Sequence, residues 1–292
     1  MQTQIVQISD THLTALGSKP VHHQQIWPEE KLRMVFDDIA QTRVRPDLIV
    51  LSGDLIHEGG VDDYAHLRQL LAAEQQLLGA PIRVILGNHD RTAAFYRGFL
   101  DIFAQKRPYD QHVILNDWDI YLLDTKCGDI EPGYLTEAQL AWLQAELAHA
   151  THPGIIFMHH PLAGPALQHM RYSVLQNGED LLRVIDHSSI RAIFSGHTHF
   201  ASSSVINGML NVVADSTAYH IDCTNHHVHR IYDGTTYNII TLNGTSVGVE
   251  QRPLYLGKEV INTIQVPNTD FVDPQILFAA MAEQEERRET VK

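Results

Sequence analysis

The chain has 292 residues, and its 44% hydrophobic content is sufficient for one large domain or one domain with an appendage. The formal net charge of −14, without any cluster of Lys and Arg, disfavours nucleic acid and anionic membranes as partners. No apolar run approaches the roughly 18 residues of a membrane helix, and the N-terminus lacks the pattern of a signal peptide. Together with two distant cysteines, Cys127 and Cys223, these features predict a cytoplasmic protein.

The first part of the chain alternates predicted strands with predicted helices. Strands are expected at 4–9, 47–52 and 82–86, and helices at 28–42 and 62–78, where apolar residues recur every three or four positions. The run at 47–52 is continuously apolar, which is typical of a strand buried on both faces. Such alternation indicates parallel strands joined by crossover helices.

The pattern continues as far as residue 199 and then changes. Further strands are expected at 112–115, 120–123, 155–158 and 192–195, and further helices at 136–148 and 179–185. Beyond residue 199, strands are predicted at 205–214, 227–232 and 236–242, with turns at Asp233-Gly234 and Asn243-Gly244. This second pattern favours antiparallel sheet, and the segment 274–292 is predicted to be helical.

Polar motifs follow five of the predicted strands, and the chain contains 19 histidines. The motifs are Asp10-Thr11-His12, Gly53-Asp54, Gly87-Asn88-His89-Asp90, His159-His160-Pro161 and Gly196-His197-Thr198-His199. Because loops at the carboxyl ends of parallel strands converge on one crevice, we expect these side chains to lie together.

The residue types in these motifs are those that bind transition metals. Asp, His and Asn offer oxygen and nitrogen ligands suited to Mn, Fe, Zn, Co or Ni. Alternate residues of an extended segment point to one side, so Asp10 and His12 can reach the same ion. An Asp-x-His pair alone is more often a turn than a ligand pair. Five ligand-rich motifs at strand ends are improbable as coincidence, and they predict a metal site.

In the order DTH, GD, GNHD, HHP and GHTH, over residues 10 to 199, the chain resembles the calcineurin-like metallophosphoesterase superfamily. Within that superfamily it is most similar to class III cyclic-nucleotide phosphodiesterases and bacterial glycerophosphodiesterases. The resemblance implies an α/β (α+β) fold of two packed mixed β-sheets flanked by helices in a four-layer sandwich. We accordingly divide the chain into a core at 1–200 with all metal-ligand motifs, a β-rich segment at 201–270 that completes the second sheet, and a helical tail at 271–292.

The resemblance also implies a set of metal ligands. Asp10, His12 and His199 would hold one ion, Asn88, His159 and His197 would hold the other, and Asp54 would bridge them. His159 is preferred to His160 because the metal histidine of the family lies two residues before the proline. His89 would act on the leaving oxygen, and Asp90 would anchor its turn. One departure is His57, where the family often has Asp or Thr.

Several residues outside the motifs are predicted to contact the substrate. They are His220, in a loop after the last motif, and Arg171 and Asn177, in the segment that follows His159-His160-Pro161. His22 and His23 are weaker candidates for the mouth of the site. His226, His227 and His229 are interpreted as an exposed strand end rather than as a further metal cluster.

The resemblance implies an enzyme, a metal-dependent phosphodiesterase that uses metal-activated water on small diesters, either 3′,5′-cyclic nucleotides or glycerophosphodiesters. Two divalent ions are expected as cofactors, from among Mn, Fe, Zn and Co. The alternatives are a phosphomonoesterase or broad-specificity phosphohydrolase of the same fold and a non-enzymatic scaffold; all seven ligand positions are filled, which disfavours the scaffold. The expected partner is the small substrate, with no nucleic acid and no membrane, and the β-rich segment and tail could form the interface of a homo-oligomer.

Overall fold

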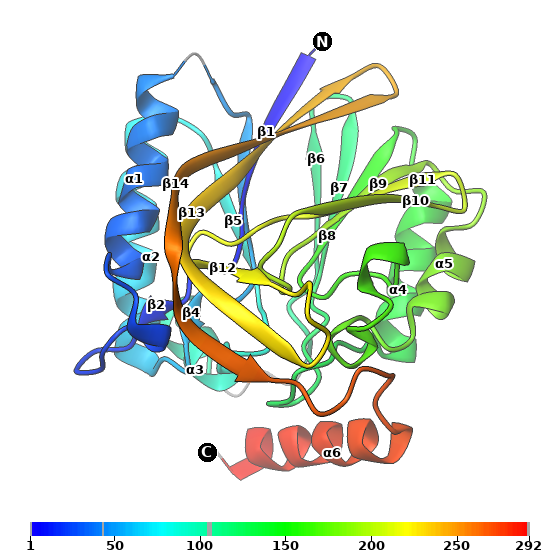
Figure 1. The fold of residues 1–292 in the computed structure, drawn as a ribbon. Helices are drawn as coiled ribbons and strands as arrows, with labels where there is room; N and C mark the ends of the chain where they lie inside the picture. The colour runs from blue at the N-terminus through cyan, green and yellow to red at the C-terminus, as the bar shows by residue number, and fades with distance from the viewer. Residues whose placement is uncertain (1, 43, 104–106, 291–292) are drawn as a thin grey trace.

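The computed structural model describes residues 2–42, 44–103 and 107–290, with side chains of the last helix as far as residue 284. Two β-sheets pack against each other, and helices cover their outer faces (Figure 1). The first sheet has the order β12 (Tyr219–Asp222), β13 (Val228–Asn243), β1 (Gln2–Ile8), β3 (Leu48–Ser52) and β5 (Ile82–Ile85), and β14 (Ser246–Gln265) also pairs with β13. Strands β1, β3 and β5 run parallel, whereas β13 is antiparallel to β1.

The second sheet is also mixed. Its order is β10 (Ser202–Ile206), β11 (Met209–Val213), β9 (Ile190–Ser195), β8 (Gly154–Met158), β7 (Trp118–Leu123) and β6 (Gln111–Leu115). Strands β11, β9, β8 and β7 are parallel, and the two edge strands are antiparallel to their neighbours. A short parallel ribbon of β2 (Leu13–Thr14) and β4 (Ile56–His57) follows the first two motifs.

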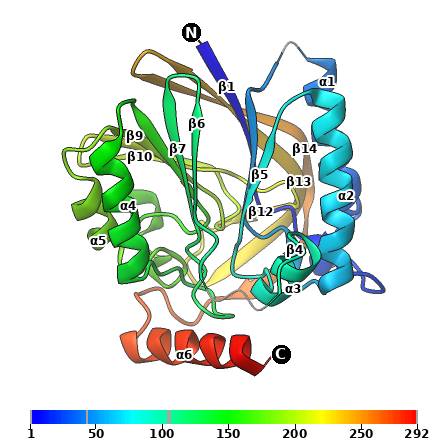
Figure 2. The same cartoon turned by 180° about the vertical axis from the view of Figure 1, so that it is seen from behind.

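The helices complete the layers (Figures 1 and 2). The first sheet is covered by α1 (Pro28–Gln41) and α2 (Val61–Leu78), and the second by α4 (Glu137–His149) and α5 (Gly178–Ile185). The remaining elements are α3 (Thr92–Gly98), α6 (Pro274–Thr290) and three short 3-10 turns, Val21–His23, Pro165–Leu167 and Arg171–Ser173. Among the described residues, no helix combines the length and the apolar character needed to cross a membrane.

Strand alternation explains why the three largest hydrophobic clusters of the described residues form separate cores. In β3, Val50 points into the core between the sheets, whereas Leu51 points toward α1 and α2. In β8, Phe157 shares the core between the sheets with Val50, whereas Met158 packs under α4 and α5. Because successive side chains of a strand face opposite sides, a continuous apolar run supplies two cores at once. The predicted four-layer arrangement of two mixed sheets and outer helices is confirmed.

Two predictions in the later part of the chain are wrong. The strand expected at 205–214 is a hairpin, because Asn207 and Gly208 both take positive φ angles, 50° and 79°, and reverse the chain. The turn expected at Asp233-Gly234 lies inside the long strand β13, where the pairing with β14 shifts register. There the Asp233 carboxylate is buried against the ammonium group of Lys31 in α1. Asp233 and Gly234 therefore lie in a bulge of the strand rather than in a solvent-facing turn.

The turn at Asn243-Gly244 is confirmed, since it joins β13 to β14 with Gly244 at a φ of 61°. The segment 201–270 contributes β10 and β11 to the second sheet, but its other strands belong to the first sheet. It therefore serves both sheets. The tail helix α6 begins at Pro274, and its expected end at residue 292 lies outside the described residues. The division of the chain into three segments stays a prediction.

Candidate metal centre

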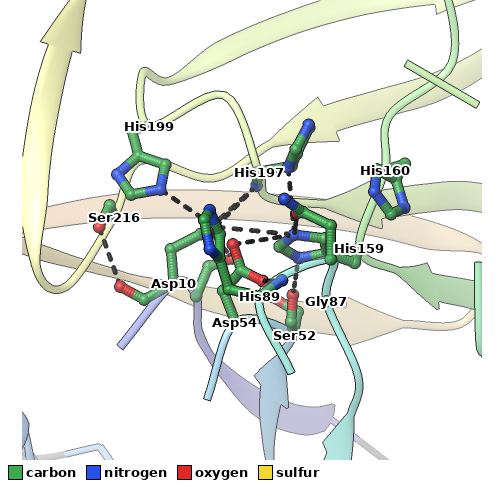
Figure 3. Close-up of polar contacts among 12 residues, drawn as sticks. Asp10, Ser52, Asp54, Gly87, His89, His159, His160, His197, His199 and Ser216 are labelled. Atoms are coloured by element: carbon green, nitrogen blue, oxygen red, sulfur yellow. Dashed lines mark hydrogen bonds and ion pairs between the residues drawn. The ribbon is translucent and has the colours of Figure 1, made fainter. Parts of the chain in front are cut away.

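Loops at the carboxyl ends of five strands bring the motif residues together (Figure 3). The first sheet contributes residues after β1, β3 and β5, and the second sheet contributes residues after β8 and β9. The predicted metal ligands are almost fully inaccessible to solvent; these are Asp10, His12, Asp54, Asn88, His159, His197 and His199. The close packing of these side chains requires glycine at residue 87, because a Cβ on Gly87 would lie 2.2 Å from Oδ1 of Asp54.

The first group of ligands joins both sheets. His12 Nε2 lies 3.1 Å from His199 Nε2 and 3.4 Å from Oδ2 of Asp54. His199 Nε2 is also 3.4 Å from Oδ1 of Asp10. The ligand atoms of these four residues all lie within 4.8 Å of one another, which is compatible with one shared ion.

The second group is centred on His159. Its Nε2 lies 3.2 Å from Oδ1 of Asn88 and 3.2 Å from Nδ1 of His197. The same nitrogen is 3.4 Å from Oδ2 of Asp54. A single carboxylate oxygen of Asp54 therefore faces both groups at equal distance, as a bridging ligand would.

Backbone carbonyls hold the outward-facing ring nitrogens of two ligands, His159 and His199. His159 Nδ1 lies 2.9 Å from the carbonyl oxygen of Ser52, and His199 Nδ1 lies 2.9 Å from that of Tyr219. Only a protonated nitrogen can donate to a carbonyl, so in each neutral ring the lone pair is on Nε2 and points into the centre. There His159 Nε2 meets the acceptor oxygen of Asn88. When the ring is neutral, its lone pair and that oxygen converge without a hydrogen between them; such an arrangement suits a cation, and the donor set fits divalent metals.

Burial and mutual charge adjust the protonation of the ligands. Burial lowers the pKa of His12 well below its usual range, so this ring is neutral. Burial opposes a charge on Asp54, but His159 beside it holds the pKa of that carboxyl well below its usual range. Burial also opposes a charge on His159, but Asp54 and Asp10 raise the pKa of His159 to about 9. A proton there takes the position of a cation, and metal binding at neutral pH would release it.

His89 stands at the edge of this centre. Its backbone N–H donates to Oδ1 of Asp54 over 2.9 Å, and its ring stacks on that of His57 with centroids 4.5 Å apart. No hydrogen bond of the His89 ring is found within the described parts of the chain. The ring borders a cavity of about 330 Å³ that also touches Asn88, Arg91 and Glu131. His89 is therefore available to an incoming molecule.

Asp90 anchors the turn of its own motif, whereas His160 lies beside the second group, with a ring nitrogen within 4.8 Å of ring nitrogens of His159 and His197. Asp90 accepts hydrogen bonds from the backbone of Gly87 and Leu55 and from the hydroxyl of Tyr64, which anchors the turn. His160 Nδ1 lies 2.8 Å from Oγ1 of Thr125. Within the described residues its buried Nε2 has no hydrogen-bond partner. The preference for His159 over His160 stays a prediction, supported by the proximity of His159 to Asp54.

Sequence reasoning missed three residues that support the second group. Ser173 Oγ lies 2.7 Å from Nε2 of His197 and donates to Oε1 of Glu131 over 2.9 Å. Glu131 also lies 3.5 Å from Nδ2 of Asn88. The buried ammonium of Lys126 donates to the carbonyl of Asn88 over 3.0 Å. These residues lie outside the motifs, and only their long-range contacts reveal them.

The predicted substrate contacts have hydrogen-bond and ion-pair partners outside the two ligand groups. His220 hydrogen-bonds Asp215 over 2.9 Å and borders a separate, largely apolar cavity of about 800 Å³. Arg171 lies 3.5 Å from Asp270 and stacks over Phe271. Asn177 bonds both backbone groups of Leu135, at 3.0 and 2.8 Å, and so joins the chain before α4 to the start of α5. Roles of His220, Arg171 and Asn177 in substrate binding stay predictions.

Of the other histidine candidates, His22 packs beside the first ligand group, His226 and His227 are exposed, and His229 is buried. The His22 ring packs on Tyr219 at 4.8 Å, and Tyr219 packs on both His12 and His199. His229 is buried, contrary to the exposed strand end expected for it, because β13 places its side chain inward.

Comparison with known proteins agrees with this geometry. The profile of the family described as calcineurin-like phosphoesterase matches residues 3–201. A cAMP/cGMP dual specificity phosphodiesterase of Mycobacterium tuberculosis is 32% identical over 222 residues, which are 75% of this chain and 69% of that protein. A glycerophosphodiester phosphodiesterase of Enterobacter lignolyticus is 31% identical over 201 residues, 67% of this chain and 70% of that protein. A 3′,5′-cyclic adenosine monophosphate phosphodiesterase of Escherichia coli strain K12 is 29% identical over 218 residues, 74% and 76% of the two chains.

Solved structures share the fold at lower identity. A dimetal phosphatase from Danio rerio superposes with a TM-score of 0.53 at 16% identity, covering 86% of this chain and 98% of that one. A purple acid phosphatase from yellow lupin gives 0.58 at 16% identity, covering 95% and 55%. The match over residues 3–201 includes every motif that builds the centre. The chain belongs to the calcineurin-like phosphoesterase family.

Proposed function

We propose that the protein is a phosphodiesterase that hydrolyses small phosphodiesters, with 3′,5′-cyclic nucleotides or glycerophosphodiesters as the substrate class. The observation that carries the proposal is the position of Asp54 Oδ2, 3.4 Å from nitrogens of both ligand groups. A carboxylate in that position favours a centre for two cations, which Asp10, His12 and His199 would hold on one side and Asn88, His159 and His197 on the other. Two such ions, when bound, supply activation of water and neutralisation of phosphoryl charge.

The side chains of this protein then have separate tasks. Ser52 and Tyr219 hold the rings of His159 and His199 through backbone carbonyls, so that the ligand nitrogens need no rearrangement when substrate binds. The two sheets exclude water from beneath the centre, which strengthens every electrostatic interaction there.

His89 is assigned to the leaving group. Its ring borders the cavity beside Asn88 and has no hydrogen-bond partner among the described residues. A protonated imidazole in this position can donate its proton to the departing alkoxide, which is otherwise a poor leaving group. The mechanism calls for no nucleophilic side chain.

The relatives guide the choice of substrate. Two of them carry names of enzymes that act on cyclic nucleotides, and one carries that of a glycerophosphodiesterase. The net charge of −14 disfavours large polyanions but tolerates a small anion where bound cations reverse the local field. We also propose a cytoplasmic location, and Mn, Fe, Zn or Co as the bound metals.

The test is a substrate panel on protein loaded with Mn²⁺. It should contain cyclic AMP, cyclic GMP, glycerophosphocholine, bis(p-nitrophenyl) phosphate and p-nitrophenyl phosphate. We expect kcat/KM for at least one biological diester to exceed that for the monoester at least about tenfold. A preference for the monoester would favour a phosphomonoesterase of the same fold. Absence of hydrolysis with metals bound would contradict the enzymatic proposal.

A further inference from the structure

We propose that His57, Glu58 and His89 form a third transition-metal site at the mouth of the centre, and that a zinc ion bound there inhibits the enzyme. One ligand atom from each residue lies within 4.8 Å of the others. Two imidazole nitrogens, one carboxylate oxygen and water complete a set that zinc commonly accepts.

The backbone holds the three residues in this arrangement. His57 ends β4, Glu58 follows it, and His89 lies in the loop after β5. The backbone N–H of Glu58 donates to the carbonyl of His89 over 3.2 Å, which ties the two loops together. The rings of His57 and His89 stack with an interplanar angle of 27°. The backbone therefore holds the three side chains together before an ion binds, so that only side-chain torsions need to change on binding.

The site is accessible to solvent, and it adjoins the first ligand group through His57 and His89. Glu58 is 60% exposed, and it borders two cavities of about 250 and 330 Å³ that also touch Arg91. His57 directs its Nδ1 toward Nδ1 of His12 at 3.3 Å, which leaves its Nε2 for another partner. An ion can thus enter from solvent without displacing Asp10, His12, Asp54 or His199.

The competing interpretation is that Glu58 serves only to pair with Arg91. Oε2 of Glu58 lies 3.2 Å from Nη2 of Arg91, but both side chains are more than half exposed. Ion pairs of that kind contribute little to stability, and one oxygen of Glu58 remains for a metal. The ion pair therefore does not prevent metal binding, although Arg91 competes weakly with the metal for the carboxylate of Glu58.

Zinc at this site would inhibit catalysis because it would bind to the ring of His89. With zinc on one ring nitrogen, His89 cannot become an imidazolium ion, and the N–H on its other nitrogen is a very weak acid, so the ring no longer supplies a proton to the leaving oxygen. This inhibitory effect rests on the proposed function, whereas binding of the third ion does not.

The experiment uses full-length protein loaded with two equivalents of Mn²⁺ and titrated with Zn²⁺. Bound Mn²⁺ and Zn²⁺ are measured by equilibrium dialysis with elemental analysis, and hydrolysis of cyclic AMP is followed in parallel. The test variant is Glu58→Gln, which removes the carboxylate. The matched control is Glu30→Gln, which makes the same change at an exposed glutamate in α1 that does not belong to the proposed site.

We expect wild type and Glu30→Gln to bind one zinc equivalent while they keep both Mn²⁺ ions and lose turnover. Glu58→Gln should bind that zinc at least about tenfold more weakly and resist inhibition to the same extent. The proposal is overturned if zinc binds equally well to Glu58→Gln, if it enters only as Mn²⁺ leaves, or if the third equivalent binds without loss of turnover. If no variant hydrolyses any substrate, the proposed function fails, and the dialysis comparison alone still decides whether the third site exists.

Discussion

The carboxylate of Asp54 occupies the central position among the ligands. Its Oδ2 faces His12 and His159 at the same distance, and its Oδ1 accepts the backbone N–H of His89. One side chain therefore connects the two ligand groups and positions the residue assigned to the leaving group. His199 in contrast belongs to the first group alone.

This difference predicts unequal metal loss. Asp54→Ala should lower the affinity for both ions, because the shared oxygen disappears, whereas His199→Ala should weaken mainly one. Metal content after dialysis against limiting Mn²⁺ would measure both effects, with the folded state verified by circular dichroism. Full metal content in Asp54→Ala would contradict the bridging role.

His89 should behave differently from the ligands. We expect His89→Ala to retain its metals but to lose turnover of cyclic AMP by roughly 10²–10⁴-fold, the usual contribution of a general acid. The loss should be smaller with bis(p-nitrophenyl) phosphate, because nitrophenolate leaves without help. An equal loss on both substrates would indicate that His89 positions the phosphate instead, and loss of metal would place it among the ligands.

At the scale of elements, a buried ion pair joins α1 to β13. The ammonium of Lys31 contacts the carboxylate of Asp233 and the carbonyl of Ala218, one residue before Tyr219. The same carboxylate accepts the backbone N–H of Gln25 over 2.9 Å. The ion pair thus fixes two chain segments, one at Gln25 and one at Ala218, next to Tyr219 in the first ligand group's surroundings.

Removal of one partner should cost more than removal of both. Lys31→Met leaves the charge of Asp233 buried alone, and we expect a loss of about 3–5 kcal/mol in unfolding free energy. The double variant Lys31→Met, Asp233→Asn should lose less, because the amide oxygen still accepts the backbone N–H. Urea unfolding would measure both, and a double variant less stable than Lys31→Met would refute the role of the charge.

A second junction, at the ends of β6 and β7, should respond to pH. Burial, together with Asp124, raises the pKa of Asp110 to about 7, and the carboxylate accepts hydrogen bonds from the backbone of Asp124 and from Gln139 at the start of α4. Because the pKa of Asp110 in the folded state exceeds its value in the unfolded state, near 3.9, the folded state keeps this proton to higher pH. The stability from Asp110 is therefore present at low pH and is lost as pH rises toward 7.

Asp110→Asn should remove this pH dependence, since the amide oxygen accepts the same hydrogen bonds without a charge. At pH 8 we expect the variant to be more stable than wild type by on the order of 1–3 kcal/mol, with the difference vanishing near pH 4. Unfolding midpoints across this pH range would measure it. A constant difference at all pH values would contradict a titrating group.

For the whole molecule, the metals should act as a link between the sheets. Asp10, His12, Asp54 and Asn88 follow strands of the first sheet, whereas His159, His197 and His199 follow strands of the second. An ion that binds only the folded chain stabilises it by about 2.7 kcal/mol at a hundredfold excess over Kd. Chelation should therefore lower Tm by roughly 5–10 °C. Asp54→Ala serves as the control, since its Tm should respond much less; an unchanged Tm in wild type would contradict structural linkage.

The motifs alone predicted that the polar residues after the strands lie together, and the resemblance to the family that these motifs carry predicted the four layers. Apolar runs define β1, β3, β5, β8 and β9, and parallel pairing within each sheet places the motifs that follow these strands at the carboxyl edge of that sheet. These are local signals, because the periodicity of a strand and the identity of the residues after it are both read within a few positions. The hairpin at Asn243-Gly244 is local for the same reason, since the turn residues reverse the chain by themselves.

Only the tertiary structure decided features that depend on distant partners. Asp233-Gly234 has the composition of a turn, but the buried Lys31, far away in the sequence, keeps it within β13. Glu131 and Ser173 acquire their contacts with His197 only when loops from separate parts of the chain meet. The side-chain amide of Asn177 likewise forms its hydrogen bonds with the backbone of Leu135, far away in the sequence. In each case the deciding energy is a long-range hydrogen bond or ion pair, which leaves no periodic pattern in the sequence.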